Sequence, residues 1–354
     1  MLDRIKIQNF KSIRELDLKL NDLNIFIGAN GVGKSNFISV FKFLNKIISK
    51  NLQNYTAQVG GADVFLHFGR KNSNFLKINL DISDEKFKDR ISVSLEPNNN
   101  DRFFIKQEFW GKDEIETSTK IKGSKHDWIS NAPSESTLIA KIEREWKVYH
   151  FHDTSDSAKV KLTGDLEDNH FLRTDAGNLA AFLYLLQQKF PDHFKNIEET
   201  IKLVAPFFGK FNLQPSRLNE DKIQLKWKEV GSDDYFNASH LSDGTLRFIC
   251  LATLLLQPEL PSAIILDEPE LGLHPYAINI LASLIKSAST KTQVLVSTQS
   301  VTLVNQFEPK DLVVVDREDN QSVFKRLDEK EIENWLEDYA LGELWEKNIF
   351  GGRP

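Results

Sequence analysis

The stretch from Leu23 to Ile48 constrains the fold of this chain more than any other. A short apolar run, Leu23 to Ile27, precedes the glycine-rich segment GANGVGKS at Gly28–Ser35, and apolar residues then recur three and four positions apart. This spacing predicts a helix with one buried face. A buried strand, a glycine-rich loop and a helix in this order form a phosphate-binding loop. A glycine turn before an ordinary helix is the weaker alternative, so the stretch predicts a nucleotide site.

Each part of the predicted loop has a chemical task. Gly31 and Gly33 allow backbone N–H groups to approach phosphate oxygens without a Cβ in the way. Lys34 is expected to reach the β- and γ-phosphates of ATP, and Ser35 to bind Mg²⁺. The predicted nucleotide-binding set also contains Gly28, Asn30, Val32 and Asn36.

Two further apolar runs end in polar residues. Ala263–Leu266 is followed by Asp267 and Glu268, and Val294–Ser297 is followed by Thr298, Gln299 and Ser300. We expect Asp267 to hold Mg²⁺, directly or through water, and Glu268 to polarise the attacking water. An apolar strand ending in Asp-Glu is ambiguous alone. Together with the loop, the strand ends predict one site at a sheet edge.

The bulk composition limits the classes of protein that remain. The single cysteine, Cys250, excludes an internal disulfide and fits a reducing cytosol. The longest apolar run, Phe248–Leu256, is too short to cross a bilayer, and the first ten residues lack the apolar core of a signal peptide. We therefore expect a cytoplasmic protein with no membrane partner.

Net charge also limits the partners. At a net charge of −6, binding to DNA or RNA requires a local basic patch. Two lysine groups are candidates, although solvated faces are the commoner explanation for such groups. They are Lys42, Lys46 and Lys50, and Lys120, Lys122 and Lys125.

The chain contains IKIQNFKSI, GANGVGKSN, LSDGT and LDEPELGLHP in this order, followed by a strand with a polar residue at its end, the switch position. This order of motifs resembles that of ABC-type ATPases in the RecF/SMC/OLD-like branch. WKVYHFHDTS and LGELWEKNIFGGRP resemble bacterial stand-alone ATP-binding proteins of this branch, some of which lie in anti-phage or toxin–antitoxin operons.

The resemblance implies an α/β P-loop NTPase. The fold is expected to be an ABC-type head with an antiparallel β-subdomain, a compact and mostly helical insertion, and no long coiled coil. The expected parts are residues 1–110, ATPase lobe one with the loop and β-subdomain; 111–210, a loop-rich and then helical insertion; and 211–354, lobe two with signature, catalytic strand and switch.

The resemblance also implies a head-to-tail homodimer. Ser242, Asp243 and Gly244 of one subunit would cap the γ-phosphate bound by the loop of the other, with two ATP molecules between them. Ser242 can also be a plain helix N-cap, and both roles are compatible. Lys11 is expected to approach the nucleotide, as basic residues at this position do in some relatives.

The sequence departs from the transporter members of the superfamily at the switch. Those members usually carry histidine there, whereas this chain has Gln299. Glutamine can bond a γ-phosphate oxygen or orient a water but cannot accept the proton, so we expect slow hydrolysis with Glu268 as the main base. A structural Gln299 bonded to backbone is the alternative. The lid glutamine is not located, and Gln58 and Gln107 are its candidates.

Three histidines and one acidic segment are the remaining functional candidates. On a strand, His150 and His152 would share a face as a metal pair, but no third ligand is visible by spacing, so a structural or allosteric role is favoured. His274 is expected to make contacts at the dimer interface. The acidic metal cluster of OLD nucleases is not recognisable, and "VVVDRED" is better explained as a solvated turn.

These features predict an ATP-driven molecular switch. It would act in anti-phage defence or genome maintenance with a separate effector, a nuclease or a toxin, and with DNA or RNA as a further partner. The alternatives are an ATPase subunit of a membrane transporter and a regulatory scaffold that binds nucleotide without hydrolysing it.

Overall fold

The computed structural model describes residues 1–84, 87–112, 142 and 146–353. The chain forms two compact units. Unit 1 comprises residues 1–148, 261–265 and 292–354, and unit 2 comprises 149–260 and 266–291. The predicted boundaries at 110 and 210 follow motif order and stay a prediction, and most of the predicted loop-rich part lies outside the described residues. Of the helices described, none is long and apolar enough to cross a membrane.

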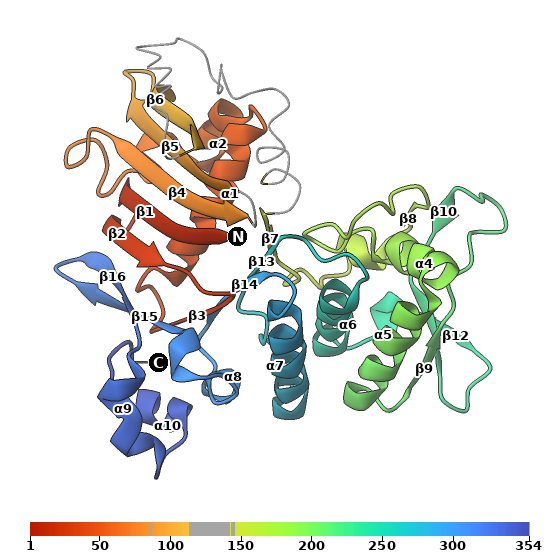
Figure 1. The fold of residues 1–354 in the computed structure, drawn as a ribbon. Helices are drawn as coiled ribbons and strands as arrows, with labels where there is room; N and C mark the ends of the chain where they lie inside the picture. Colours follow the sequence, from red (N-terminus) through yellow and green to blue (C-terminus); the bar gives the residue numbers. More distant parts are fainter. Residues whose placement is uncertain (85–86, 113–141, 143–145, 354) are drawn as a thin grey trace. The chain divides into compact units, whose positions relative to one another are not determined.

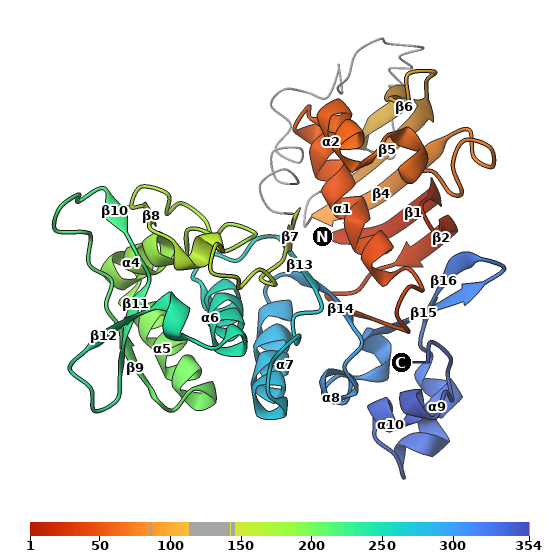
Figure 2. The ribbon, with the colours of Figure 1, turned by 180° about the vertical axis from the view of Figure 1, so that it is seen from behind.

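An antiparallel sheet and two helices build one part of unit 1. The strand order is β2-β1-β4-β5-β6. The helices α1 and α2 lie against one face of this sheet (Figures 1 and 2). In the middle of β1, Ile5 and Ile7 are buried and Lys6 between them is not, and Leu16 and Leu18 of β2 follow the same period of two. The bounds are β1 Leu2–Phe10, β2 Ile13–Lys19, β4 Leu76–Asp84, β5 Phe87–Pro97, β6 Phe103–Lys112, α1 Lys34–Ile48 and α2 Leu52–Val59.

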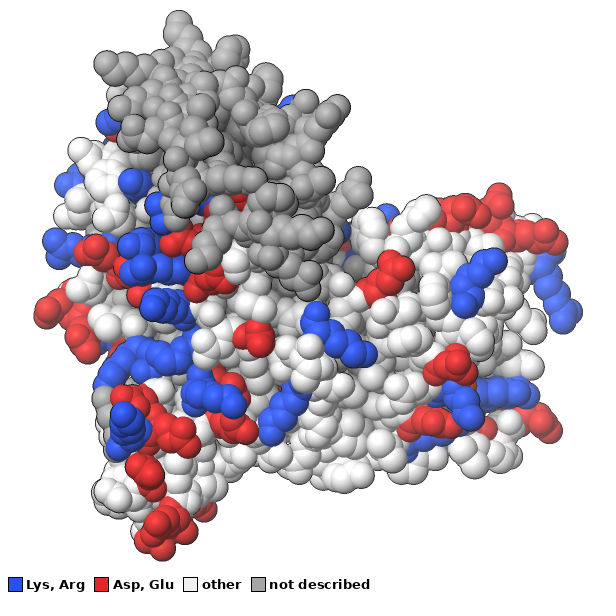
Figure 3. Space-filling view, viewed as in Figure 1, with Lys and Arg blue, Asp and Glu red and all other residues white. Residues whose placement is uncertain are grey.

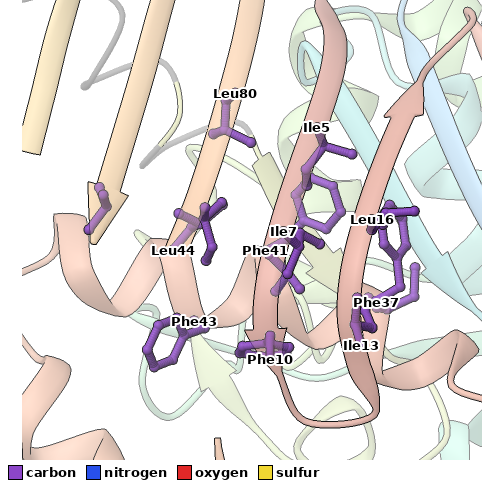
Figure 4. Close-up of a cluster of buried hydrophobic side chains, with 14 of the residues drawn as sticks. Ile5, Ile7, Phe10, Ile13, Leu16, Phe37, Phe41, Phe43, Leu44 and Leu80 are labelled. Atoms are coloured by element: carbon purple, nitrogen blue, oxygen red, sulfur yellow. The ribbon is translucent and has the colours of Figure 1, made fainter. Parts of the chain in front are cut away.

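The core of unit 1 lies between α1 and that sheet. Figure 4 shows side chains of β1, β2 and β4 directed toward those of α1. Phe43 has ring centroids of Phe10, Phe65 and Phe103 at 5.6, 4.9 and 5.9 Å. This packing holds α1, and with it the loop at its start, on a rigid base.

A second, mostly parallel sheet has the order β16-β15-β3-β14-β13-β7. Both β14 and β15 run parallel to β3, whereas β16 is antiparallel to β15. Every residue of β3 and β14 is buried, as expected for strands covered on both faces. The bounds are β3 Leu23–Ile27, β7 Trp146–Tyr149, β13 Ala263–Asp267, β14 Gln293–Thr298, β15 Leu312–Glu318 and β16 Gln321–Arg326.

The chain end returns to the second sheet of unit 1. Its helices are α8 (Val301–Val304), α9 (Glu329–Leu336) and α10 (Leu341–Glu346). Trp345 is fully buried and its Nε1 donates to the carbonyl of Gly352. The N–H of Gly352 in turn donates to Asp316 Oδ2 at 3.2 Å. Buried packing and these bonds tie the last residues to β15.

Unit 2 contains four helices and two small sheets among its described residues. The sheet orders are β12-β11-β9 and β10-β8. Cys250 is buried in α6, and burial raises the pKa of its thiol, which makes it unreactive. The bounds are α4 Leu179–Lys189, α5 Pro191–Val204, α6 Asp243–Leu256, α7 Pro275–Ser289, β8 Gly164–Asp165, β9 Phe208–Phe211, β10 Lys222–Ile223, β11 Lys226–Glu229 and β12 Tyr235–Asn237.

Four short 3₁₀ helices join these elements in the described part of the chain. They are η1 Ala62–Val64, η2 Lys159–Lys161, η3 Ala238–His240 and η4 Pro309–Asp311.

Candidate nucleotide-binding site

The glycine-rich loop has backbone conformations that require glycine. Gly31 has φ +80° and open space where a Cβ would lie, and Gly33 has φ +119°. Gly33 is the N-cap of α1, which is described throughout and has neither a capping side-chain hydrogen bond nor an acidic residue in its first turn. The first N–H groups of this helix therefore suit an external anion.

Lys34 and Ser35 occupy the first turn of α1. The Lys34 side chain is buried, and its ammonium donates to the carbonyls of Gly28 at 2.5 Å and Ala29 at 2.9 Å. It is thus held inside the loop, within reach of a phosphate bound there. Ser35 is exposed and presents its hydroxyl at the helix start. A nucleoside triphosphate with Mg²⁺ needs a lysine and backbone N–H groups for its phosphates and a hydroxyl oxygen for the metal, and this loop has all three.

The top of the loop is supported by a chain of hydrogen bonds. Asn36 Nδ2 donates to Ser12 Oγ at 2.7 Å, and Ser12 Oγ lies 2.7 Å from Ser322 Oγ. Ser322 also donates to the carbonyl of Val32. Because a carbonyl only accepts and Ser322 has one hydroxyl proton, Ser12 is the donor to Ser322. The sequence does not predict the roles of Ser12 and Ser322, because no motif links residues so far apart. Binding of nucleotide by Asn36 stays a prediction.

Replacing Ser322 with alanine is expected to destabilise unit 1. Ser322 is buried, so the variant leaves the Val32 carbonyl and the Ser12 hydroxyl without this partner. We expect the free energy of unfolding in urea to fall by about 1–2 kcal/mol. The control Ser287→Ala, at an exposed position of α7, should change it by less than about 0.5 kcal/mol. Equal values for the two variants would show that the hydroxyl chain does not hold the loop.

Strand register brings the switch residue to the start of the loop. Thr298 at the end of β14 is the register partner of Ile27 at the end of β3. Because the two strands are parallel, the next residues, Gln299 and Gly28, lie side by side at the same sheet edge. Gln299 is half-buried there. A role toward the γ-phosphate and the structural alternative both stay open for this side chain.

Lys11 lies beside α1 rather than in the loop itself. It has φ +49° in the turn after β1, and its Nζ donates to Ser39 Oγ at 3.0 Å. The ammonium also lies 5.6 and 5.8 Å from the ring centroids of Phe10 and Phe65. Burial, together with the charge of Lys42, lowers the pKa of Lys11. Ser39 is one helical turn beyond Ser35, and a contact of Lys11 with nucleotide stays a prediction.

The two carboxylates predicted to act in hydrolysis lie at the end of β13, in unit 2. Asp267 is the last residue of the strand, and Glu268 has the left-handed φ of +48°. Both are partly exposed. The carbonyl of Glu268 accepts from Leu271 N at 3.2 Å and from His152 Nε2 at 3.3 Å. Carboxylate oxygens suit the predicted tasks of binding Mg²⁺ and activating water.

The signature turn also lies in unit 2. Ser242 is the N-cap of α6, because its Oγ accepts from Thr245 N at 3.2 Å, which confirms the N-cap role. Asp243 adds a carboxylate to the first turn, so the helix dipole alone does not make an anion site here. A Cβ on Gly244 would collide with the carbonyl of Gly272, so only glycine allows this turn to pack on the loop after Glu268.

The histidines take positions that differ from a strand pair. β7 ends at Tyr149, so His150 and His152 follow the strand, with ring centroids 5.6 Å apart. No group of three or more His, Cys, Asp or Glu suited to a metal occurs among the described residues. His274 is the N-cap of α7, where its Nδ1 accepts from Tyr276 N at 3.3 Å. Its predicted interface contact stays a prediction.

Known proteins resemble this chain in sequence and in fold. Residues 23–305 match the family model AAA_21, described as "AAA domain, putative AbiEii toxin, Type IV TA system". The energy-coupling factor transporter ATP-binding protein EcfA of Methanocaldococcus jannaschii is 32% identical over 114 residues, 31% of this chain and 40% of that protein. EcfA2 of Streptococcus agalactiae is 30% identical over 148 residues, 40% of this chain and 48% of that protein. The chain thus spans less than half the length of these curated relatives.

Solved structures show the same architecture over most of the chain. An SMC head bound to the C-winged helix domain of ScpA has a TM-score of 0.64 at 14% identity, covering 93% of this chain and 98% of that one. The SMC head of Pyrococcus furiosus, bound to the C-terminal domain of ScpA, has a TM-score of 0.61 at 14% identity, covering 95% and 98%. The predicted fold class and the resemblance to the SMC-like branch are confirmed. The chain belongs to the AAA_21 family and has the fold of a P-loop ATPase of the ABC and SMC-head type.

Proposed function

We propose that this protein binds and hydrolyses ATP and uses it as a switch between an open and a closed state. The observation that carries the proposal is the loop at Gly28–Ser35: the N-cap Gly33 has no capping side-chain hydrogen bond, the first turn of α1 contains no acidic residue, and Lys34 donates to two loop carbonyls. A pre-formed anion site of this kind favours a polyphosphate over an uncharged ligand.

Each residue of the site has its own role in ATP binding or hydrolysis. Lys34 and the N–H groups of the loop bind the β- and γ-phosphates, and Ser35 and Asp267 supply oxygen ligands for Mg²⁺. Mg²⁺ neutralises phosphate charge when bound. Glu268 accepts the proton of the attacking water, whereas Gln299 orients that water or bonds the γ-phosphate. Because Gln299 cannot accept a proton, turnover is slow and depends on Glu268.

The closed state is a head-to-tail homodimer in this proposal. Ser242 and Gly244 of one subunit meet the γ-phosphate bound by the loop of the partner copy. ATP favours the closed dimer because only there do both subunits contact it, and hydrolysis removes that preference. Asp243 repels phosphate, so the contact depends on the Ser242 hydroxyl and on N–H groups.

The effector is proposed to be a separate protein. The family description names a toxin–antitoxin system, which pairs two proteins. We propose a nuclease or toxin as the effector, in anti-phage defence or genome maintenance. Two of the SMC heads with this fold were solved with ScpA bound, which supports a protein partner for this chain. On the face shown in Figure 3, basic and acidic side chains both occur. DNA or RNA stays a further proposed partner, which would require a local basic patch.

A transporter subunit is the second candidate, favoured by the similarity to EcfA and EcfA2. Gln299 in place of the usual switch histidine counts against it. Recovery of the tagged protein with membranes from its own host would support this candidate. Recovery in the supernatant alone would favour the switch.

Light scattering after size-exclusion chromatography tests the closed dimer. The Glu268→Gln variant should elute with a mass near 40.6 kDa alone and near twice that mass with ATP and Mg²⁺, because blocked hydrolysis preserves the closed state. Adding Ser242→Arg should abolish the doubling, since a bulky side chain then fills the place of the γ-phosphate contact.

A matched control separates this effect from general damage. Ser216→Arg places the same charge at an exposed loop position of unit 2 and should leave the doubling intact. A mass that ignores ATP, or a doubling that survives Ser242→Arg, contradicts the trans dimer while leaving ATP binding to be measured separately.

A further inference from the structure

The segment HFHDTS after β7 has no task in the proposed reaction, yet it contacts the catalytic turn. His152 Nε2 lies 3.3 Å from the carbonyl oxygen of Glu268. A carbonyl oxygen only accepts, so in this contact Nε2 is the ring nitrogen that carries a hydrogen and donates. We propose that His152 is a positioning residue that holds the backbone of Glu268, and thereby sets the direction of its carboxylate. The inference rests on the proposed function of Glu268 as the base.

Glu268 is the kind of residue that needs such support. Its φ of +48° is left-handed, a region that residues other than glycine, asparagine and aspartate rarely adopt. A residue keeps such a conformation only where its surroundings over-determine it. Here the turn bond from Leu271 N, at 3.2 Å, and the bond from His152 converge on one carbonyl. Rotation of this peptide would swing the carboxylate away from its target.

Arg247 in turn fixes His152. It projects from α6, five residues after the signature serine, and donates through NH2 to the carbonyl of His152 at 3.0 Å. Its NH1 donates to the carbonyl of Leu271 at 2.8 Å, in the same turn as Glu268. One guanidinium thus holds both the residue that supports Glu268 and the turn that contains it. The planar fork of arginine suits two carbonyls at once, which lysine does not.

A small cavity adjoins this arrangement. It measures about 10 Å³, and Arg247, His152 and Asp267 are among its polar lining residues. Tyr149, Phe151, Leu251, Leu266 and Pro269 complete the lining. The His152 ring thus lies at this cavity together with apolar side chains and Asp267 of the strand end, and the His150 ring is its neighbour at 5.6 Å.

Replacing His152 with side chains of different length tests this positioning role. His152→Gln places an amide N–H near the position of Nε2, His152→Asn is too short to reach it, and His152→Leu removes the donor. We expect His152→Leu and His152→Asn to lower kcat for ATP about tenfold or more, because a small misdirection of the base is costly. His152→Gln should stay within about threefold of wild type, and none should change the Kd of a fluorescent ATP analogue more than about twofold.

Two controls exclude a general structural effect. His170→Leu alters an exposed histidine of unit 2 and should leave kcat unchanged. In a Glu268→Gln background, His152→Leu should slow turnover no further, because both changes remove the same contribution. The two polar variants keep the test valid even where His152→Leu does not fold.

The outcomes separate this inference from the proposed function. A wild-type kcat in His152→Asn, or a His152→Gln enzyme as slow as His152→Asn, overturns the positioning role while ATP hydrolysis stands. Additive losses in the double variant overturn it as well. A wild-type protein that does not turn over ATP, and behaves like Glu268→Gln, overturns the proposed function itself.

Discussion

Replacing Lys34 with alanine is expected to abolish stable ATP binding. Its ammonium lies inside the loop, 2.5 and 2.9 Å from two loop carbonyls, and in the proposed complex it meets the β- and γ-phosphates. Loss of a buried charge-assisted contact of this kind should weaken the affinity for ATP about 100-fold or more, equivalent to roughly 3 kcal/mol. Isothermal titration calorimetry with ATP and Mg²⁺ measures the change directly.

Lys71→Ala is the matched control for this variant. Lys71 is an exposed lysine of unit 1, so its removal alters the net charge equally but leaves the loop intact. Its affinity for ATP should equal that of wild type. An unaltered affinity in a folded Lys34→Ala protein, shown by an unchanged melting curve, would mean that the loop does not bind phosphate through this lysine.

The Glu268→Gln variant is expected to separate binding from hydrolysis. Glutamine keeps the size of the side chain but cannot accept the proton of the attacking water. We expect kcat to fall about 100- to 1,000-fold, within the usual contribution of a general base, while the affinity for ATP changes by less than about threefold. Phosphate release at saturating ATP, together with calorimetry, provides both quantities.

Glu259→Gln controls for the loss of one negative charge in unit 2, because Glu259 is exposed and precedes β13. It should retain the wild-type kcat. A Glu268→Gln enzyme that hydrolyses ATP at the wild-type rate would move the base elsewhere. If neither wild type nor variant hydrolyses ATP, a scaffold that binds nucleotide without turnover becomes the better description.

Local pattern was sufficient for the elements that carry the motifs. The apolar run at Leu23–Ile27 and the 3.6 spacing after Lys34 correspond to β3 and α1, and the run ending at Asp267 corresponds to β13. These elements were predictable because each signal lies within one continuous segment, where periodicity and glycine conformation act over a few residues. The antiparallel β-subdomain that the resemblance implies corresponds to the sheet β2-β1-β4-β5-β6.

Contacts between distant segments were not predictable in this way. Ser322 supports Val32 from 290 residues away, and His152 reaches Glu268 across 116 residues. Ser322 carries no motif of its own, and the two histidines of HFHD indicated a metal pair as readily as a structural role. Ser322 can support the loop after β3 only because β16, β15 and β3 belong to one sheet, in this order.

The sequence by itself was sufficient to predict the glycine-rich loop, the two carboxylates at the end of β13 and the superfamily to which the motifs belong. Each of these predictions rests on residues that are adjacent in the chain, so it does not depend on how distant segments pack. Only the tertiary structure decided that Gln299 lies beside Gly28, that Ser12 and Ser322 hold the loop, and that Arg247 and His152 converge on the turn of Glu268. Hydrogen bonds have a reach of about 3 Å, so such partners are set by strand register and packing, which short-range sequence patterns do not encode.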